Sequence, residues 1–349
     1  MKQKNVAVFF GGCSPEYSVS LTSAHAVLSH LDQQKYNAIP VGISKEGSWY
    51  YYTGSLSRLL DDTWLRCEIC TPAMLSLDRS AHKLYLFENT GVSSLPIDVA
   101  FPVLHGKNGE DGTIQGAIAM TGIALAGCGV LASALCMDKD RAHKLASLAG
   151  VRVPQGLVLD ADSDFHKASS FATKIGYPLY VKPVKAGSSF GITRVETPEQ
   201  LAKAIDCAFL YDDQIILEEN IEGFEIGCAV LGSKTLLTGA VDEIELSQGF
   251  FDFTEKYTLQ SASIHVPARI SDDKAEEIKQ TAKQVYRALG CAGFARVDLF
   301  LTPSGEIVFN EVNTIPGFTE HSRYPGMMKA AGYSLSDVLD RIIEQAVEQ

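Results

Sequence analysis

The sequence FARVDLF at residues 294–300 is followed, after a short connection, by IVFNEVN at residues 307–313. Both segments are rich in Val, Ile and Phe, which favour β-strands. The connection contains Pro303, Ser304 and Gly305, a composition typical of a turn. We therefore expect the two segments to pair as an antiparallel hairpin.

Three side chains with oxygen donors lie on this hairpin: Asp298, Glu311 and Asn313. Glu311 and Asn313 are two residues apart, so both project from the same face of their strand. Two carboxylates and an amide suit Mg²⁺, which prefers oxygen ligands. Arg296 precedes Asp298 by two residues and shares its face, where a cation can stabilise charge on a reacting carboxyl or phosphoryl group. The alternative is a half-exposed hairpin with solvated polar residues.

The composition is that of a globular protein with more than one core. The chain has 349 residues, of which 46% are hydrophobic and 21% charged, and this length suits two or three domains. The net charge of −12 argues against nucleic acid as a partner, because the phosphate backbone repels an acidic protein. Residues 112–137 carry no charge, but glycines and polar residues interrupt them. We expect a buried helix, strand and loop there, and no membrane span.

Two further features favour a cytoplasmic location. The apolar run at residues 6–10 is too short for a signal peptide. The eight cysteines are scattered; only Cys67 and Cys70 have the spacing of a metal or redox pair, and no second pair completes a zinc site. We expect reduced thiols, as is usual in the cytoplasm.

The chain opens with a strand, a glycine turn and a helix. Residues 6–10 are apolar, a Gly-Gly pair follows, and residues 19–31 have helical periodicity. With a second strand at 37–43, this pattern predicts a parallel α/β domain. Dinucleotide-binding domains open in the same way, but the full G-x-G-x-x-G motif is absent. A strand at 97–104 leads into a Gly-rich loop that starts at His105, where open α/β sheets bind ligands; a structural His105 is the alternative.

A second pattern indicates phosphate binding. Lys182 lies at the end of a strand predicted at 177–183, and the loop at 185–192 is built of small residues whose amides and hydroxyls can hold phosphates. It is not a Walker A loop, because Gly-Lys-Ser/Thr is absent. Strands follow at 214–219 and 224–230. Helices are expected to begin near Met137 and to span 197–210, 275–289 and 334–347.

Motifs at five places, in the same order along the chain, resemble those of the ATP-grasp carboxylate–amine ligases, and specifically the D-alanine–D-alanine ligases. They are GGCSPEYSVSLTSA at 11–24, HGKNGEDGTIQG at 105–116, the lysine strand and loop at 177–192, FFDFTEKY at 250–257, and RVDLF with FNEVNTIPGFTEHS at 296–300 and 309–322. The resemblance implies an α/β ATP-grasp fold with three domains. These are a Rossmann-like domain at 1–130 and two α+β domains at 131–220 and 221–349 that grip ATP, the last with the metal site and a lid.

The resemblance also implies residues that hold the nucleotide and metal. Glu218 would bind the adenine amine and Glu225 the ribose hydroxyls, while lysines would neutralise phosphate charge. The ATP-binding set is Lys139, Lys182, Ser189, Glu218, Glu225 and Lys256. Asp298, Glu311 and Asn313 would bind Mg²⁺ or Mn²⁺, with two ions expected.

The amino-acid substrates are assigned in the same way. Glu16 would anchor the ammonium group of the first D-amino acid, and Ser322 would hold the carboxylate of the second. Arg296 and the backbone N–H of Gly317 would stabilise the tetrahedral oxyanion. Ser188 and Tyr257 would orient the first substrate and its lid, and His105 and Phe250 would contact substrate.

One departure from the family pattern bears on the second substrate. D-alanine–D-alanine ligases carry an apolar residue after Ser322, where this chain has Arg323. A guanidinium can hold a hydroxyl, so we expect D-alanyl-D-serine as product, as in the D-alanine–D-serine ligases of vancomycin resistance. The alternatives are a surface Arg323 paired with Glu320, and a plain D-alanine–D-alanine ligase of cell-wall synthesis. D-Lactate is disfavoured, because its ligases place a histidine in the lid region that holds Lys256.

Other classes explain less of the chain. A dinucleotide-dependent oxidoreductase would account for the first domain and not for the clustered acids near the C-terminus. A nucleotide-binding sensor would not need the full set of lysines and metal ligands. Biotin carboxylase-like enzymes are disfavoured by Glu16 and the loop at 105–112. The expected partners are ATP, D-alanine and D-serine, with no nucleic acid or membrane, and the resemblance implies a homodimer.

Overall fold

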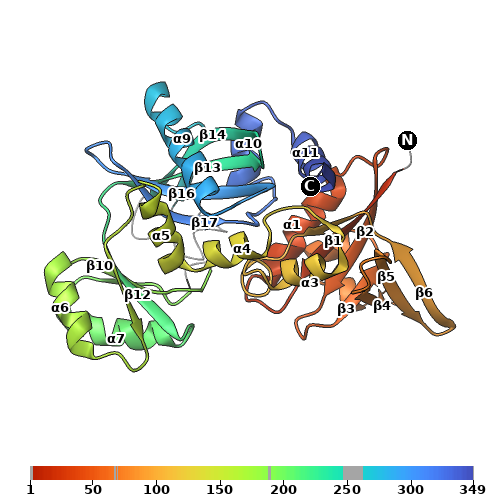
Figure 1. Cartoon of the computed structure of the whole chain (residues 1–349), viewed down its shortest axis with the longest axis horizontal. Coiled ribbons are helices and arrows are strands. Elements are labelled where there is room, and N and C mark those ends of the chain that lie inside the picture. The colour runs from red at the N-terminus through yellow and green to blue at the C-terminus, as the bar shows by residue number, and fades with distance from the viewer. Residues whose placement is uncertain (1–2, 67, 69, 188–189, 247–261, 349) are drawn as a thin grey trace.

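The computed structural model describes residues 3–66, 68, 70–187, 190–246 and 262–348. Within these residues the strands form three β-sheets that follow one another along the chain (Figure 1). The first and largest sheet lies at one end of the elongated molecule, the second at the other, and the third lies above and between them in this view. The predicted mixed α/β architecture is confirmed, while the exact domain boundaries stay a prediction.

The first sheet has eight strands in the order β6-β5-β4-β3-β2-β1-β7-β8. The four strands from β2 to β8 are parallel, as the opening of the chain predicts, and the others are antiparallel. The strands are β1 (Lys4–Gly11), β2 (Tyr36–Ile43), β3 (Trp49–Tyr52), β4 (Cys70–Leu75), β5 (Lys83–Glu88), β6 (Gly91–Pro96), β7 (Val99–Pro102) and β8 (Ala124–Leu125).

Strand β1 is buried on both faces because helices pack on each side of it. Val6 and Val8 join one core with α1 (Tyr17–His30), and Ala7 and Phe9 join another with α3 (Thr113–Thr121). Such two-sided burial explains the continuous apolar run in this part of the sequence. Two short helical turns, α2 (Ser57–Leu60) and η1 (Trp64–Arg66), complete this part of the chain.

The second sheet has four strands in the order β11-β10-β12-β9. Helices α6 (Phe165–Ile175) and α7 (Pro198–Phe209) cover one face and form a separate core with it. The other face is turned toward the third sheet (Figure 1). The strands are β9 (Gly156–Asp160), β10 (Leu179–Pro183), β11 (Thr193–Val195) and β12 (Gln214–Glu219).

The third sheet has five strands in the order β15-β14-β13-β16-β17. Helices α4 (Val130–Met137), α5 (Lys139–Leu148) and α9 (Asp272–Ala288) share a core with it, and α10 (Arg323–Ala330) packs on β13 and β14. Helices α4 and α5 fall in the range predicted for the central domain but pack here. The strands are β13 (Phe224–Gly232), β14 (Leu236–Leu246), β15 (Ala262–His265), β16 (Phe294–Leu301) and β17 (Ile307–Asn313).

The last helix, α11 (Leu335–Glu348), returns to the first part of the molecule. Val338, Leu339, Ile342 and Ile343 are fully buried in the core that also holds β1 and α1. Figure 1 shows α11 beside α1, close to the N-terminal strand. The two ends of the sequence therefore share one hydrophobic core.

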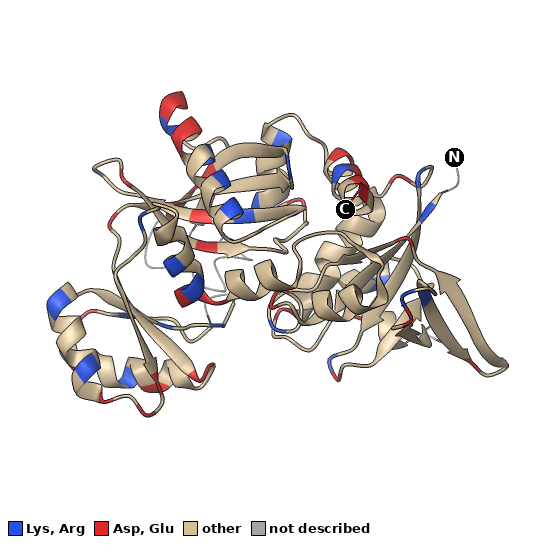
Figure 2. Cartoon of the chain, in the orientation of Figure 1, with Lys and Arg blue, Asp and Glu red and all other residues tan. Residues whose placement is uncertain are grey.

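Charge and hydrophobicity agree with the expectations from composition. Acidic and basic residues are interspersed over all three parts of the chain (Figure 2). The charge-free residues 112–137 form parts of α3, β8 and α4, as predicted. In the described ranges no helix is long and apolar enough to cross a bilayer. The cysteines that the structure describes are free thiols, and Cys67 lies outside the described residues.

Candidate active site

The predicted hairpin is present as β16 and β17, paired antiparallel with Asp298 opposite Glu311 and Arg296 opposite Asn313. Arg296 donates from Nε to Asp298 Oδ1 at 2.8 Å and from Nη2 to Oδ2 at 2.7 Å. The same-face placement of these two side chains is therefore confirmed. The predicted acids and amide are brought together on neighbouring strands.

A β-bulge interrupts the hairpin next to these residues. Asp298 pairs with Glu311 but Leu299 pairs with Phe309, so Asn310 is the extra residue. Its carbonyl oxygen accepts a hydrogen bond from His143 Nε2 at 2.7 Å. The bulge thus ties the hairpin to helix α5, which begins with Lys139.

The chemistry of the donor set fits a hard divalent cation. No three His, Cys, Asp or Glu side chains cluster within metal-binding reach among the described residues, so the set is two carboxylates, Asp298 and Glu311, and the Asn313 amide. Asp298 is almost fully buried, and Asn313 Nδ2 donates to its Oδ2 at 2.9 Å. Asn313 Oδ1 remains the amide's acceptor, so all three residues offer the oxygen ligands that Mg²⁺ prefers.

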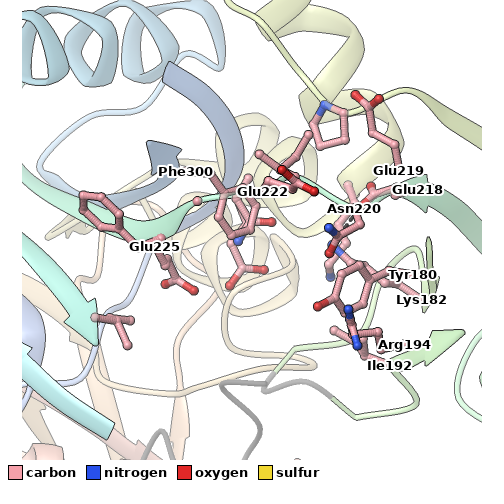
Figure 3. Close-up of a pocket in the computed structure, with 18 of the residues that line it drawn as sticks. Tyr180, Lys182, Ile192, Arg194, Glu218, Glu219, Asn220, Glu222, Glu225 and Phe300 are labelled. Carbon is pink, nitrogen blue, oxygen red and sulfur yellow. Dashed lines mark ion pairs between the residues drawn. The ribbon is translucent and has the colours of Figure 1, made fainter. Parts of the chain in front are cut away.

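A pocket of about 870 Å³ lies between the second and third sheets. Figure 3 shows Tyr180, Lys182 and Arg194 on one side of it, with Glu225 and Phe300 on the other. Lys139 and Glu311 also line it. A pocket of this size, with charged groups of both signs, suits a nucleotide.

Lys182, Glu218 and His143 form a buried group in the wall of this pocket. Lys182 Nζ is 2.6 Å from Glu218 Oε2, and His143 Nδ1 is 3.3 Å from Oε1. Burial would lower the pKa of Lys182, but the Glu218 carboxylate outweighs burial and raises it. Burial likewise raises the pKa of Glu218, and Lys182 more than offsets this, so the pKa is lowered. Glu218 therefore acts as a counterion to Lys182, a role that the sequence did not predict.

A small cavity of about 40 Å³ adjoins the pocket, and residues from all three parts of the chain line it, on α4, α5, β17 and the loops around Glu16, Glu110 and Gly187. Glu16 follows β1 and has only 7% of its surface exposed. A Cβ built on Gly106 would lie 2.2 Å from Glu16 Oε2, and one on Gly187 would lie 3.2 Å from it. These two glycines bring their backbones close to the Glu16 carboxylate, and Gly106 also has the positive φ of +68° that glycine favours.

His105 and Glu110 hold both polar groups of the Ile315 peptide unit. His105 Nδ1–H donates to the Ile315 carbonyl at 2.8 Å, and the Ile315 N–H donates to Glu110 Oε1 at 3.0 Å. Burial lowers the pKa of His105 to about 4, so a neutral ring accepts from Ser23 through Nε2 at 3.1 Å. Burial and the charge of Glu16 raise the pKa of Glu110 to about 8. His105 thus has a structural partner, and its predicted substrate contact stays a prediction.

The loop after β17 places Gly317 against Ser322. A Cβ on Gly317 would lie 2.7 Å from Ser322 Oγ. Ser322 Oγ accepts from the Thr319 N–H at 3.1 Å and lies 2.7 Å from Thr319 Oγ1. This close approach leaves no space for a side chain at residue 317.

Arg323 is buried, with 7% of its surface exposed. Its Nε and Nη2 donate to the two oxygens of Asp242 at 2.8 and 2.9 Å, and its Nη1 donates to Glu225 at 2.6 Å and lies 3.3 Å from Asp298 Oδ1. Burial would lower the pKa of Arg323, but these three carboxylates outweigh burial and raise it. The alternative of a surface arginine paired with Glu320 is wrong.

The comparison with known proteins decides the family. The model for the N-terminus of D-Ala–D-Ala ligases matches residues 5–128, and the model for their C-terminus matches residues 145–344. This chain belongs to the D-alanine–D-alanine ligase family. It is therefore an ATP-dependent ligase of the carboxylate–amine class with the ATP-grasp fold, and not a dinucleotide-dependent oxidoreductase.

Three relatives of this ligase carry different names. A putative D-alanine–D-lactate ligase of Streptomyces coelicolor is 43% identical over 99% of both chains. The vancomycin C-type resistance protein VanC1 of Enterococcus gallinarum is also 43% identical over 99% of both. The crystal structure of the VanG D-Ala:D-Ser ligase of Enterococcus faecalis is 51% identical, with a TM-score of 0.92 over 99% of this chain and 100% of that one.

Five of the predicted site residues of the ligase lie outside the described residues. They are Ser188, Ser189, Phe250, Lys256 and Tyr257. Their roles, and the lid expected at residues 250–257, stay predictions. Strands β14 and β15 lead into and out of this segment at the edge of the third sheet.

The structure adds residues that sequence reasoning missed. His143 lies four positions after Lys139 on α5, and this i, i+4 spacing places both on one face. Glu110 lies inside the motif at 105–116, but only His105 was singled out there. Nothing in the sequence around Asp242 indicates its ion pair, because its partner Arg323 is far away in the sequence.

Proposed function

We propose that this ligase joins D-alanine to D-serine through an acyl phosphate. The D-alanine carboxylate takes the γ-phosphoryl group of ATP and ADP is released. The amine of D-serine, after losing its proton, attacks the acyl carbon, the bond from that carbon to the phosphate oxygen breaks, and inorganic phosphate leaves. The D-alanyl part is supported by the family, and the D-serine part by Arg323 and by the 51% identity to a D-Ala:D-Ser ligase.

The pocket between the second and third sheets suits ATP. Lys182 and Lys139 line it beside Glu225 and Glu311, and Lys256 and Ser189 would join them. The lysines neutralise the charge of the phosphates. Lys139 is held in place because its Nζ donates to the Ala186 carbonyl at 2.7 Å. We retain Glu218 as the residue nearest adenine, with Lys182 and His143 fixing its carboxylate, and Glu225 for the ribose hydroxyls.

Asp298, Glu311 and Asn313 would hold Mg²⁺ or Mn²⁺, two ions in all. The ions would neutralise phosphate charge when bound. Asp298 also fixes Arg296, whose Nη1 is the nitrogen not used in the pair with Asp298. Arg296 Nη1 and the N–H of Gly317 would stabilise the oxyanion of the tetrahedral intermediate.

The first D-amino acid would bind beside Glu16, whose carboxylate suits its ammonium group. Ser188 and Tyr257 would orient this substrate, and His105 would support it through the Ile315 loop. Ser322 would hold the carboxylate of the second substrate. Closure of the segment around Phe250 would exclude water, which otherwise hydrolyses the acyl phosphate.

The observation that carries the choice of D-serine is the buried Arg323–Asp242 pair next to Ser322. An apolar residue at 323 would pack on the methyl group of D-alanine, whereas this charged pair keeps the neighbourhood polar. A site that hydrogen-bonds a hydroxyl discriminates against the analogue that lacks it. Asp242 and Glu225 engage most of the guanidinium donors, so Arg323 is held in one orientation.

Competition between D-serine and D-alanine at equal concentration tests this proposal. We expect wild type to form at least about tenfold more D-alanyl-D-serine, since one hydroxyl contact contributes about 1.5 kcal/mol. Arg323→Met alone leaves Asp242 buried without its charge partner, so Arg323→Met/Asp242→Asn is the informative variant. We expect it to reverse the preference while ATP use is retained.

Arg341→Met is the control, because Arg341 is exposed on α11 and stacks on Tyr333. A wild type that prefers D-alanine identifies a D-alanine–D-alanine ligase of normal cell-wall synthesis. If the folded double variant gives the same ratio of D-alanyl-D-serine to D-alanyl-D-alanine as wild type, Arg323 does not determine the choice of second substrate. A third reaction with D-lactate as the second substrate tests the activity named for the Streptomyces relative.

The proposed product fits a modified peptidoglycan precursor and resistance to vancomycin. We propose that the enzyme works in the cytoplasm, where ATP and D-amino acids are available, and that it forms a homodimer. Sedimentation of the purified protein tests the dimer directly.

A further inference from the structure

Thr314 carries a buried hydroxyl that the other described residues leave unsatisfied. Only 1% of its surface is exposed, and no hydrogen-bond partner lies within reach of Oγ1 in the described part of the chain. A buried hydroxyl without a partner is unfavourable. A small polar group that enters the protein would supply the missing partner.

The hydroxyl belongs to the small cavity and not to the nucleotide pocket. Thr314 lines the cavity of about 40 Å³ together with Glu16, Glu110, Lys139 and Asn313. A cavity of this size holds a group no larger than one or a few waters. An ammonium group has such a size and carries three N–H donors.

The charges around the cavity favour a cation. Glu16 and Glu110 both line it, and Lys139 directs its Nζ to the Ala186 carbonyl. Burial and the charge of Glu16 raise the pKa of Glu110 to about 8, so a cation in the cavity offsets the cost of placing these carboxyl groups together. A phosphate group would meet the same two carboxylates unfavourably.

We propose that Thr314 is a substrate-binding residue, whose hydroxyl accepts a hydrogen bond from the ammonium group of the D-amino acid that is activated by ATP. This inference rests on the proposed function, in which Glu16 anchors that ammonium group. It adds a neutral acceptor to the carboxylate of Glu16, contributed by the residue that follows strand β17.

The chain offers a matched control in Thr121, which is also fully buried. Its hydroxyl donates to the Ile118 carbonyl at 2.7 Å and accepts from the Ile123 N–H at 3.1 Å. Thr→Val removes the same hydroxyl at both positions with nearly the same volume. The lost hydroxyl has hydrogen-bond partners among the described residues at Thr121 and none among them at Thr314.

We expect opposite results from the two variants. Thr314→Val should keep or raise the melting temperature of the free protein and weaken D-alanine binding at least tenfold. Thr121→Val should lower the melting temperature and leave D-alanine binding unchanged. Thr314→Ser, which keeps the hydroxyl, should bind D-alanine within threefold of wild type.

Binding is measured by thermal shift with D-alanine in the presence of a non-hydrolysable ATP analogue, and KM for D-alanine as donor is measured at saturating ATP and D-serine. Unchanged D-alanine binding by folded Thr314→Val overturns the proposal. So does a loss confined to D-serine or ATP, or a fall in melting temperature that matches Thr121→Val. Because binding requires no turnover, a failure to form D-alanyl-D-serine refutes the proposed function without affecting this test.

Discussion

The nucleotide pocket and the small cavity share Lys139, Ala186 and Glu311 but are built in different ways. The pocket of about 870 Å³ lies between two sheets, and its buried Lys182 is neutralised by Glu218. The cavity of about 40 Å³ is lined by residues of α4, α5, β17 and the loops that hold Glu16, Glu110 and Gly187, and Glu16, Glu110 and Glu311 are its three carboxylates. A pocket whose lysine is neutralised by a paired carboxylate suits a large polyanion, while a small cavity with three carboxylates and one lysine suits a small cation. Glu311 lies where the two meet.

The largest effect is expected at that junction. Glu311→Gln removes a charge and a proposed metal ligand from the boundary of both spaces, and kcat should fall about 1000-fold while the fold is retained. The exposed Glu306→Gln, in the turn of the same hairpin, is the control and should have near-normal activity. Phosphate release and far-UV circular dichroism measure the two properties. Near-normal turnover by folded Glu311→Gln would show that the pocket and the cavity do not depend on a shared metal.

A smaller effect on kinetics is expected from a change that affects only the pocket proposed for ATP. His143→Phe removes the contacts to Glu218 and to the Asn310 carbonyl, so we expect KM for ATP to rise about tenfold, the result of losing about 1.5 kcal/mol. KM for the amino acids should stay within about twofold, because His143 does not line the small cavity. His143→Gln retains a hydrogen-bond donor, so its KM for ATP should lie between those of wild type and His143→Phe.

His166→Phe provides the reference for that experiment, since His166 lies exposed on α6. Steady-state kinetics with each substrate varied in turn give the three KM values. An equal rise in all of them would mean that His143 supports the whole fold and not the nucleotide pocket.

The smallest effect concerns the charge of the cavity. The pKa of Glu110 is raised from 4.5 to about 8, so the folded protein binds this proton more tightly than the unfolded chain. Stability from this group is present below pH 4.5 and is lost as the pH rises toward 8. Glu110→Gln cannot titrate, so its melting temperature should fall less between pH 5 and pH 8.5 than that of wild type. Parallel curves for the two proteins would refute this assignment.

Local patterns in the sequence were sufficient to predict the hairpin and its chemistry. Glu311 and Asn313 share a face because strand side chains alternate, and Arg296 meets Asp298 for the same reason. The strand and turn that lead to Glu16 follow equally from an apolar run and two glycines. These features depend on neighbours within a few residues.

Contacts between distant segments could not be predicted in this way. Arg323 was expected to face a substrate hydroxyl or solvent, yet its donors engage Asp242 and Glu225 on other strands. Glu218 was expected to face only adenine, yet it contacts Lys182 on β10 and His143 on α5. The bulge at Asn310, which directs a carbonyl to α5, has no signature in the local sequence.

Because α1 and α11 share one core, the first part of this protein can finish folding only after α11 has been synthesised. The ribosome makes the first sheet early, and Val338 and Ile342, which bury part of its helical layer, follow only after the other two sheets have been made. Until then the nascent chain presents an apolar surface around α1 that has no cover within the protein. Loss of the final helix, by truncation or premature termination, would expose that surface permanently and make the shortened chain a substrate for chaperones and proteases.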